Sequence, residues 1–280
     1  MYIQVNHQDI YAYTAGKALD AAKPTIVFIH GVLNDHSVWI LQSRYLANHG
    51  FNVLAIDLPG HGKSTGNCPQ SVEDAAASVI ALLDAIKAVH GIDKAALVGH
   101  SWGSLIAMHT ASLAPQRVTH LAMLATAYPM KVSPALLDSA LNKPLDAIDM
   151  VYTFSHSTLS PPPSSLGPGT WLYGGSKALM RRVLAGGLER SSSENLFHLG
   201  FTACNDYAQG FEAFSDMEYS KLAILFIVGK YDQMTTPKAA QGLINAAPRA
   251  KVVTVDAGHQ LMSEAPDATL AALYQLVKSG

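Results

Sequence analysis

The chain has 280 residues, 49% of them hydrophobic, so it is long and apolar enough to bury a sizeable core and is not disordered as a whole. Its 19 basic and 21 acidic residues give a net charge of −2 and form no basic block, which argues against nucleic acid as a partner. Two widely separated cysteines indicate no disulfide framework, and no apolar run reaches the roughly 20 residues that a membrane span needs. The start of the chain lacks a charged-then-apolar signal segment, so we expect a cytoplasmic protein.

Strand and helix patterns alternate along the first part of the chain. Alternating polar and apolar residues predict a hairpin at about Tyr2 to Thr14. β-Branched runs predict strands and apolar residues at helical spacing predict helices. These elements are a strand at Thr25–Ile29, a helix near Ser37–Asn48, a strand at Asn52–Ile56 and a helix from about Ser71 to His90. Ser71 and Asp74 resemble a capping box at the start of the last of them.

The most informative segment is Gly99-His100-Ser101-Trp102-Gly103. It follows the apolar run Ala95–Val98 and leads into a helical pattern. A nucleophile elbow needs this order of strand, tight turn and helix, because the serine hydroxyl must stand clear of the sheet. The flanking glycines let neighbouring backbone pass close by. Ser101 is therefore the candidate nucleophile.

The regular alternation stops after a predicted strand at Val118–Leu124. Residues from about 131 to 215 show helical patterns, a proline-rich loop at Ser160–Gly169 and scattered aromatics. Ser191 and Glu194 resemble a capping box that opens an apolar helix within this segment. Strands at Ala223–Val228 and Lys251–Val255 and a helix at about Ala265–Lys278 complete the predicted elements.

The loops after the last two strands carry an acid and a base. A serine hydroxyl needs a base to remove its proton, and His259 lies in the loop after the final strand. Asp232, after the strand before it, is placed to orient the imidazole. The loop His30-Gly31-Val32 after an early strand is placed to form an oxyanion hole, with the backbone N–H groups of Val32 and Trp102 as donors. The chain order Ser, Asp, His distinguishes this triad from two other common serine hydrolase arrangements.

Over nearly its whole length the chain resembles the α/β-hydrolase fold superfamily. The motifs that carry the resemblance are His30-Gly31, Asp57 to Ser64, the Ser101 elbow, Gly229-x-x-Asp232 to Pro237, and Gly258-His259 to Pro266. The resemblance implies an α/β fold, with a mostly parallel sheet of the eight-stranded type, helices on both faces and an inserted helical lid. We therefore expect residues 1–130 and 216–280 to form the core domain and residues 131–215 the lid.

Other carboxylates could compete with Asp232. Asp57 follows an earlier strand and Asp206 lies in the expected lid, so neither has the right position. Glu264 and Asp256 flank His259, and we expect them to cap or solvate the last helix.

No cofactor or metal is expected. Gly62-Lys63-Ser64 resembles the end of a phosphate-binding loop, but the earlier glycine that such a loop requires falls at Asp57. Gly60-x-Gly62 lacks the third small residue and the strand-to-helix context of a dinucleotide site. The histidines show no paired spacing typical of metal ligands.

A serine at the elbow points to acyl transfer, whereas relatives that open epoxides or displace halide carry a carboxylate there. We therefore expect a carboxylic ester hydrolase acting on small to medium, mainly apolar substrates, as a monomer or homodimer. Alternatives remain open: carbon–carbon bond hydrolysis, cofactor-free perhydrolysis or haloperoxidase activity, thioester or amide cleavage, and slow-turnover ligand binding on the same fold. Aromatic side chains are candidates for the pocket by residue type: Trp39, Tyr128, Phe154, Trp171 and Phe197.

Overall fold

A computed structural model of the chain describes residues 1–157, 172–190, 195–215, 217 and 222–278. Within them, eight strands form one sheet in the order β1-β2-β4-β3-β5-β6-β7-β8. The strands are β1 (Tyr2–Val5), β2 (Gln8–Tyr13), β3 (Thr25–Ile29), β4 (Asn52–Ile56), β5 (Ala95–His100), β6 (Val118–Leu124), β7 (Ala223–Gly229) and β8 (Lys251–Val255). The pairs β1–β2 and β2–β4 are antiparallel and the other five pairs are parallel. This mostly parallel sheet confirms the predicted fold class.

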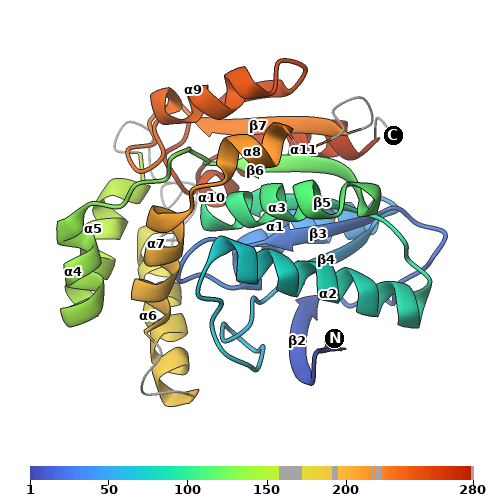
Figure 1. Cartoon of the computed structure of the whole chain (residues 1–280), viewed down its shortest axis with the longest axis horizontal. Coiled ribbons are helices and arrows are strands. Elements are labelled where there is room, and N and C mark those ends of the chain that lie inside the picture. Colours follow the sequence, from blue (N-terminus) through green and yellow to red (C-terminus); the bar gives the residue numbers. More distant parts are fainter. Residues whose placement is uncertain (158–171, 191–194, 216, 218–221, 279–280) are drawn as a thin grey trace.

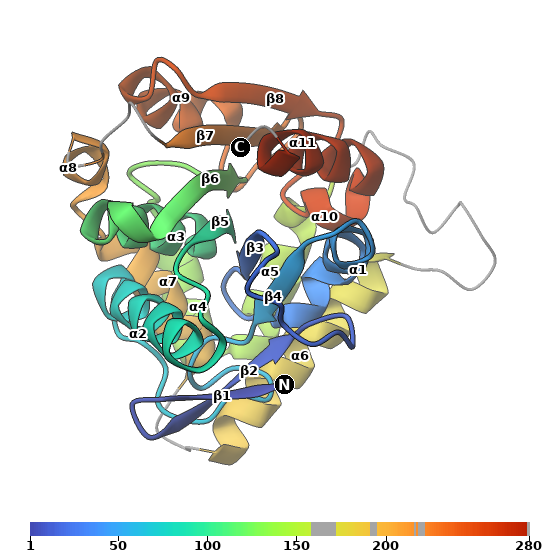
Figure 2. The ribbon, with the colours of Figure 1, turned by 90° about the vertical axis from the view of Figure 1, so that its right-hand side faces the viewer.

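Helices cover both faces of the sheet (Figure 2). One face carries α2 (Val72–His90), α3 (Trp102–Leu113) and α9 (Pro237–Ala246), and the other carries α1 (Ile40–Asn48) and α11 (Pro266–Lys278). Shorter elements are the 3-10 helices η1 (His36–Trp39) and η2 (Pro115–Arg117) and the one-turn helix α10 (Leu261–Glu264). Because helices exclude water from both sides, every residue of β3, β4 and β5 is buried, which is why these strands are continuous apolar runs.

The local signals around α2 act as expected. The Ser71 hydroxyl accepts a hydrogen bond from the backbone N–H of Asp74, and Glu73 and Asp74 place negative charge in the first turn. Gly91 ends the helix in the left-handed conformation, with φ of 70°. The predicted start and end of this helix are therefore confirmed.

The described residues between β6 and β7 are mainly helical. They contain α4 (Pro134–Asn142), α5 (Pro144–Ser155), α6 (Leu172–Arg190), α7 (Leu196–Asp206) and α8 (Gly210–Ser215). Figure 1 shows α4, α5, α6 and α7 together at one end of the sheet. The predicted proline-rich loop and the pair Ser191 and Glu194 lie outside the described residues. Helix α7 is capped by Asn195, whose side chain accepts from the N–H groups of Phe197 and His198.

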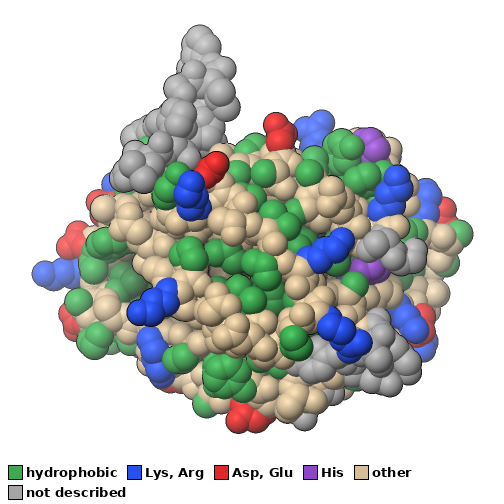
Figure 3. Space-filling model, turned by 90° about the horizontal axis from the view of Figure 1, so that it is seen from above, with side chains coloured by type: hydrophobic (Ala, Val, Ile, Leu, Met, Phe, Trp, Pro, Cys, Tyr) green, Lys and Arg blue, Asp and Glu red, His purple; other side chains and the backbone are tan. Residues whose placement is uncertain are grey.

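Charged side chains are scattered among apolar and polar ones on the face drawn in Figure 3. A helix with the length and hydropathy to cross a membrane does not occur in the described part of the chain.

Candidate active site

Ser101 lies in a strained turn between β5 and α3. Its φ of 53° and ψ of −121° fall in a backbone region that residues other than glycine rarely adopt. The turn is possible because glycines lie two residues before and two residues after Ser101. A Cβ atom at Gly99 would lie 2.1 Å from the Gly103 carbonyl oxygen, and one at Gly103 would lie 2.4 Å from the Ile29 oxygen. Strand β5, strand β3 and helix α3 can therefore approach one another only with glycine at these two positions.

Asp232 and His259 come together because they follow neighbouring parallel strands. Asp232 comes three residues after the end of β7, and His259 comes four residues after the end of β8. The Asp232 Oδ2 atom lies 2.9 Å from His259 Nδ1. Both side chains are almost fully buried, so their hydrogen bond is shielded from water.

Thr235 completes the environment of this carboxylate, and no pattern in the sequence pointed to it. Its N–H donates to Asp232 Oδ1 at 2.9 Å, beside the N–H of Met234 at 2.8 Å. Its hydroxyl donates to Asp232 Oδ2 at 2.7 Å and lies 3.1 Å from His259 Nδ1. Burial by itself would raise the pKa of Asp232, but the charge of His259 and the hydrogen bonds from His259 and Thr235 outweigh it and lower this pKa. An ionised Asp232 accepts the Nδ1–H and leaves Nε2 as the basic atom of the ring.

Ser101 and His259 line the same cavity, of about 230 Å³. Among the described residues, the Ser101 hydroxyl has no hydrogen-bond partner, so the contact with His259 Nε2 is not formed in this structure. Catalytic hydrogen bonds of substrate-free enzymes are often long and tighten only when substrate binds. The geometry thus brings the three candidate residues to one site and leaves the last contact open.

The expected oxyanion donors lie beside the nucleophile. Gly31 packs against the elbow, since a Cβ atom there would lie 3.2 Å from the Ser101 Cβ. Val32 lines a small cavity together with Ser101, and Trp102 is the first residue of α3. Neither N–H group has an acceptor in the described part of the chain, so both are available to a developing negative charge.

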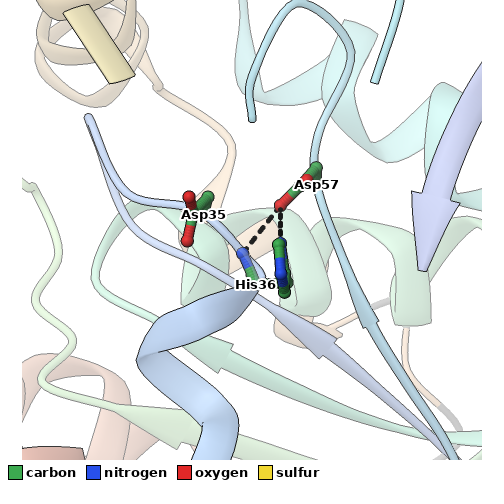
Figure 4. Close-up of side chains that lie close together, drawn as sticks. All are labelled: Asp35, His36 and Asp57. Atoms are coloured by element: carbon green, nitrogen blue, oxygen red, sulfur yellow. Dashed lines mark hydrogen bonds and ion pairs between the residues drawn. The ribbon is translucent and has the colours of Figure 1, made fainter. Parts of the chain in front are cut away.

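Asp57 faces another partner. Its Oδ1 accepts from the backbone N–H and the ring Nδ1–H of His36, at 2.7 and 2.8 Å (Figure 4). Its Oδ2 accepts from the N–H of Lys63 at 2.8 Å. Nearby, Asp35 accepts from Ser37 and pairs with Arg182. The side chains of Asp35, His36 and Asp57 are close enough together to suggest a metal site. Their carboxylates, however, already accept hydrogen bonds from protein donors. The cluster therefore connects the loops that follow β3 and β4.

The aromatic candidates separate into three groups. Phe154 lines the cavity that holds Ser101, together with Leu136, Val151 and Phe201. Trp39, Tyr128 and Phe197 do not line it. Trp39 is fully buried under the sheet against Phe28, at 5.1 Å between ring centroids, because it belongs to the core on the α1 and α11 side. The sequence could not separate these roles, because residue type alone does not tell which face of the sheet a ring packs on.

The other two rings that miss the cavity have their own partners. Tyr128 packs edge-on against Phe211 in α8, at 4.9 Å between centroids. Phe197 is fully buried behind Phe201, at 5.0 Å. The fifth candidate, Trp171, lies outside the described residues.

Several known proteins share sequence or fold with this chain. A family model described as alpha/beta hydrolase fold matches residues 24–266. The dihydrolipoyllysine-residue acetyltransferase component of the acetoin cleaving system of Pseudomonas putida is 38% identical over 103 residues, which are 36% of this chain and 26% of that protein. An epoxide hydrolase of Caballeronia sordidicola is 33% identical over 99 residues, 34% of this chain and 29% of that protein.

These matches thus span about a quarter to a third of the relatives' length. A solved esterase of Exiguobacterium antarcticum superposes with a TM-score of 0.80, over 99% of this chain and 98% of that one, at 16% identity. At that identity the likeness speaks for the fold alone.

Proposed function

The chain belongs to the alpha/beta hydrolase fold family, and from this membership and the geometry around Ser101 we propose that it is a serine hydrolase of carboxylic esters. The observation that carries the proposal is the meeting of three features around Ser101. These are a serine on a strained elbow, a histidine held by a buried carboxylate, and two backbone N–H groups without acceptors.

The geometry supports a two-step acyl transfer. His259 Nε2 takes the proton of the Ser101 hydroxyl as its oxygen attacks the ester carbonyl carbon. The N–H groups of Val32 and Trp102 stabilise the negative charge on the former carbonyl oxygen. The protonated imidazole then gives its proton to the leaving alcohol as the carbon–oxygen bond breaks, which leaves an acyl-enzyme. Water, activated by the same histidine, releases the acid and restores the serine.

The dimensions of the cavity favour a small to medium apolar acyl or alcohol group. Its walls include Leu136, Val151, Phe154 and Phe201, which come from α4, α5 and α7. We propose that residues 131–215 act as a lid that shapes this pocket. Apolar side chains predominate in the lining, beside the polar Lys131, Ser133 and Gln233. Such a site orients a substrate through its polar groups and the reacting ester.

The nucleophile argues against the activity named for the epoxide hydrolase relative, since Ser101 stands where epoxide-opening members carry a carboxylate. An ester, a thioester and an amide would all fit the same triad. The acyl group that each forms on Ser101 is the common intermediate to look for.

A screen of p-nitrophenyl esters of graded chain length tests the proposal, with a serine-directed phosphonate as a parallel probe. We expect turnover of short to medium esters, labelling at Ser101, and loss of both in Ser101→Ala. Turnover that persists in Ser101→Ala would refute the assignment of the nucleophile. Labelling without turnover of any ester, thioester or amide would favour a binding protein.

A further inference from the structure

The side chain of Glu264 joins two distant parts of the chain. Glu264 is the last residue of α10 and is nine-tenths buried. One carboxylate oxygen, Oε2, accepts from the backbone N–H of Ser157 at 2.8 Å and from that of Gly258 at 3.1 Å. The other, Oε1, accepts from the N–H of Gln260 at 3.2 Å. Ser157 lies just beyond the end of α5, in the inserted segment, and the other two residues flank His259.

This placement corrects the expectation that Glu264 caps or solvates the last helix. Helix α11 begins two residues later at Pro266, and the carboxylate points back toward the loop that precedes α10. A buried carboxylate needs several donors to offset its lost hydration, and here backbone N–H groups from two segments supply them. Asp256, by contrast, is exposed and pairs with Lys230 on the surface.

The backbone of His259 itself has two further anchors. Its N–H donates to the Ser155 carbonyl oxygen at 2.7 Å, and its own carbonyl oxygen accepts from His100 Nε2 at 2.8 Å. The end of α5 therefore holds His259 through Ser155, and Glu264 binds the same end of α5 through Ser157. The backbone of His259 and the end of α5 are therefore held by connected hydrogen bonds.

We propose that Glu264 is a positioning residue. Its carboxylate fixes the His259 loop (residues 256–260) and the end of α5 in one arrangement, which sets where the imidazole stands relative to Ser101. A displacement of the end of α5 would thus be passed to His259, so the inserted segment and the base of the reaction are mechanically linked. The catalytic part of this inference rests on the proposed function; the structural part does not.

The test compares Glu264→Gln with Asp256→Asn, a matched removal of charge from the loop that precedes α10. Glutamine has nearly the same shape but only one acceptor oxygen, so its NH₂ group would meet at least one of the three N–H donors. Backbone hydrogen exchange of peptides covering 150–157 and 255–262 reports whether the loop and α5 remain fixed. The rate constant for phosphonate labelling of Ser101, per titrated active site, reports whether His259 still activates the serine.

In Glu264→Gln we expect faster exchange in both peptides and labelling slowed by roughly 10- to 100-fold, since small misplacements of catalytic groups cost about that much. The kcat for ester hydrolysis should fall, with little change in KM. Asp256→Asn should leave exchange and labelling as in the native protein. If Glu264→Gln fails to fold, Glu264→Asp, which keeps the charge but is one methylene shorter, takes its place. We expect it to speed hydrogen exchange and slow labelling, both by smaller factors.

Exchange unchanged in the folded variant would overturn the proposal, and so would faster exchange with an unchanged labelling rate. A loss of thermal stability with a native labelling rate per active site would mean that Glu264 supports the fold alone, which contradicts positioning. If the native protein is not labelled at Ser101 at all, the proposed function has failed, and hydrogen exchange alone then decides the structural part.

Discussion

The Nε2–H of His100, the residue directly before Ser101, donates a hydrogen bond of 2.8 Å to the backbone carbonyl oxygen of His259. The acceptor is a carbonyl, so Nε2 must carry the hydrogen, and Nδ1 keeps its lone pair. Burial, followed by the nearby charge of His259, lowers the pKa of His100 to about 3. A neutral histidine in the elbow thus fixes the loop that carries the expected base.

Acid should destabilise the fold through His100. Its ordinary pKa is 6.5 and its folded pKa is about 3, so between these values the unfolded chain binds a proton that the folded chain does not. The free energy of unfolding therefore falls as pH drops through this window, by roughly 1 kcal/mol per pH unit from this residue. Urea unfolding at several pH values between 4 and 7 measures the slope.

His100→Gln isolates this contribution, because the glutamine amide can still donate to the His259 carbonyl but does not titrate. We expect a shallower dependence of unfolding free energy on pH. Equal slopes in the native protein and His100→Gln would contradict the assignment.

The candidate triad should behave as one unit. Ser101→Ala and His259→Ala are each expected to lower kcat/KM for esters by about 10⁴-fold or more, and the double variant by little more than either, because each removal disables the same step. Rates measured on the three proteins, with circular dichroism to verify folding, check this. Losses that multiply in the double variant would show that the two residues act independently.

Removing the Asp232 carboxylate should lower kcat far more than removing the Thr235 hydroxyl. Asp232→Asn is expected to lower kcat by roughly 10⁴-fold, because the amide favours the wrong tautomer of His259. Thr235→Val should cost roughly 10-fold, the loss of one hydrogen bond to a charged group. Steady-state kinetics with Asp256→Asn as the control separates these effects. A mild effect of Asp232→Asn would place the orienting acid elsewhere.

Phe201 should influence which ester is preferred. It lines the cavity with Ser101, whereas Phe197 lies buried behind it, so the two residues form a matched pair on α7. Phe201→Ala should shift the preference toward longer acyl chains, by roughly 1–3 kcal/mol of discrimination per added methylene contact. Phe197→Ala should lower stability by roughly 3–5 kcal/mol and leave the ranking of esters as it was.

Rates across the p-nitrophenyl ester series give the ranking, and denaturant unfolding gives the stability. If Phe201→Ala slows all esters by one common factor, the pocket does not lie where we place it.

Glycine at position 103 should be indispensable for the elbow. An alanine Cβ there would lie 2.4 Å from the Ile29 oxygen, which belongs to rigid sheet backbone. We expect Gly103→Ala to destabilise the protein by more than roughly 2 kcal/mol, as measured by urea unfolding. In α6, a Cβ at Gly175 would meet no atom within 4 Å, so Gly175→Ala should be neutral or stabilising by roughly 0.5–1 kcal/mol. Equal stability of the two variants would argue against the close approach.

The sequence by itself determined the strands, the helices α1, α2, α3 and α11, and the three candidate triad residues. It could do so because each signal is local. A buried strand is a continuous apolar run, the elbow needs glycines two residues on either side of Ser101, and Asp232 and His259 each lie within four residues of the end of a strand. Parallel strands end at one edge of a sheet, so loops far apart in the sequence meet there without further information.

Tertiary structure alone decided which side chains support these residues. Glu264 looked like a helix cap, yet its carboxylate binds the His259 loop and the end of α5, a partner more than 100 residues away. Trp39 was a pocket candidate by type, yet it packs in the core on the opposite face of the sheet from α3. A side chain's partners depend on which distant backbone donors and apolar surfaces the fold brings within a few ångströms, and no pattern of neighbours along the chain encodes that distance.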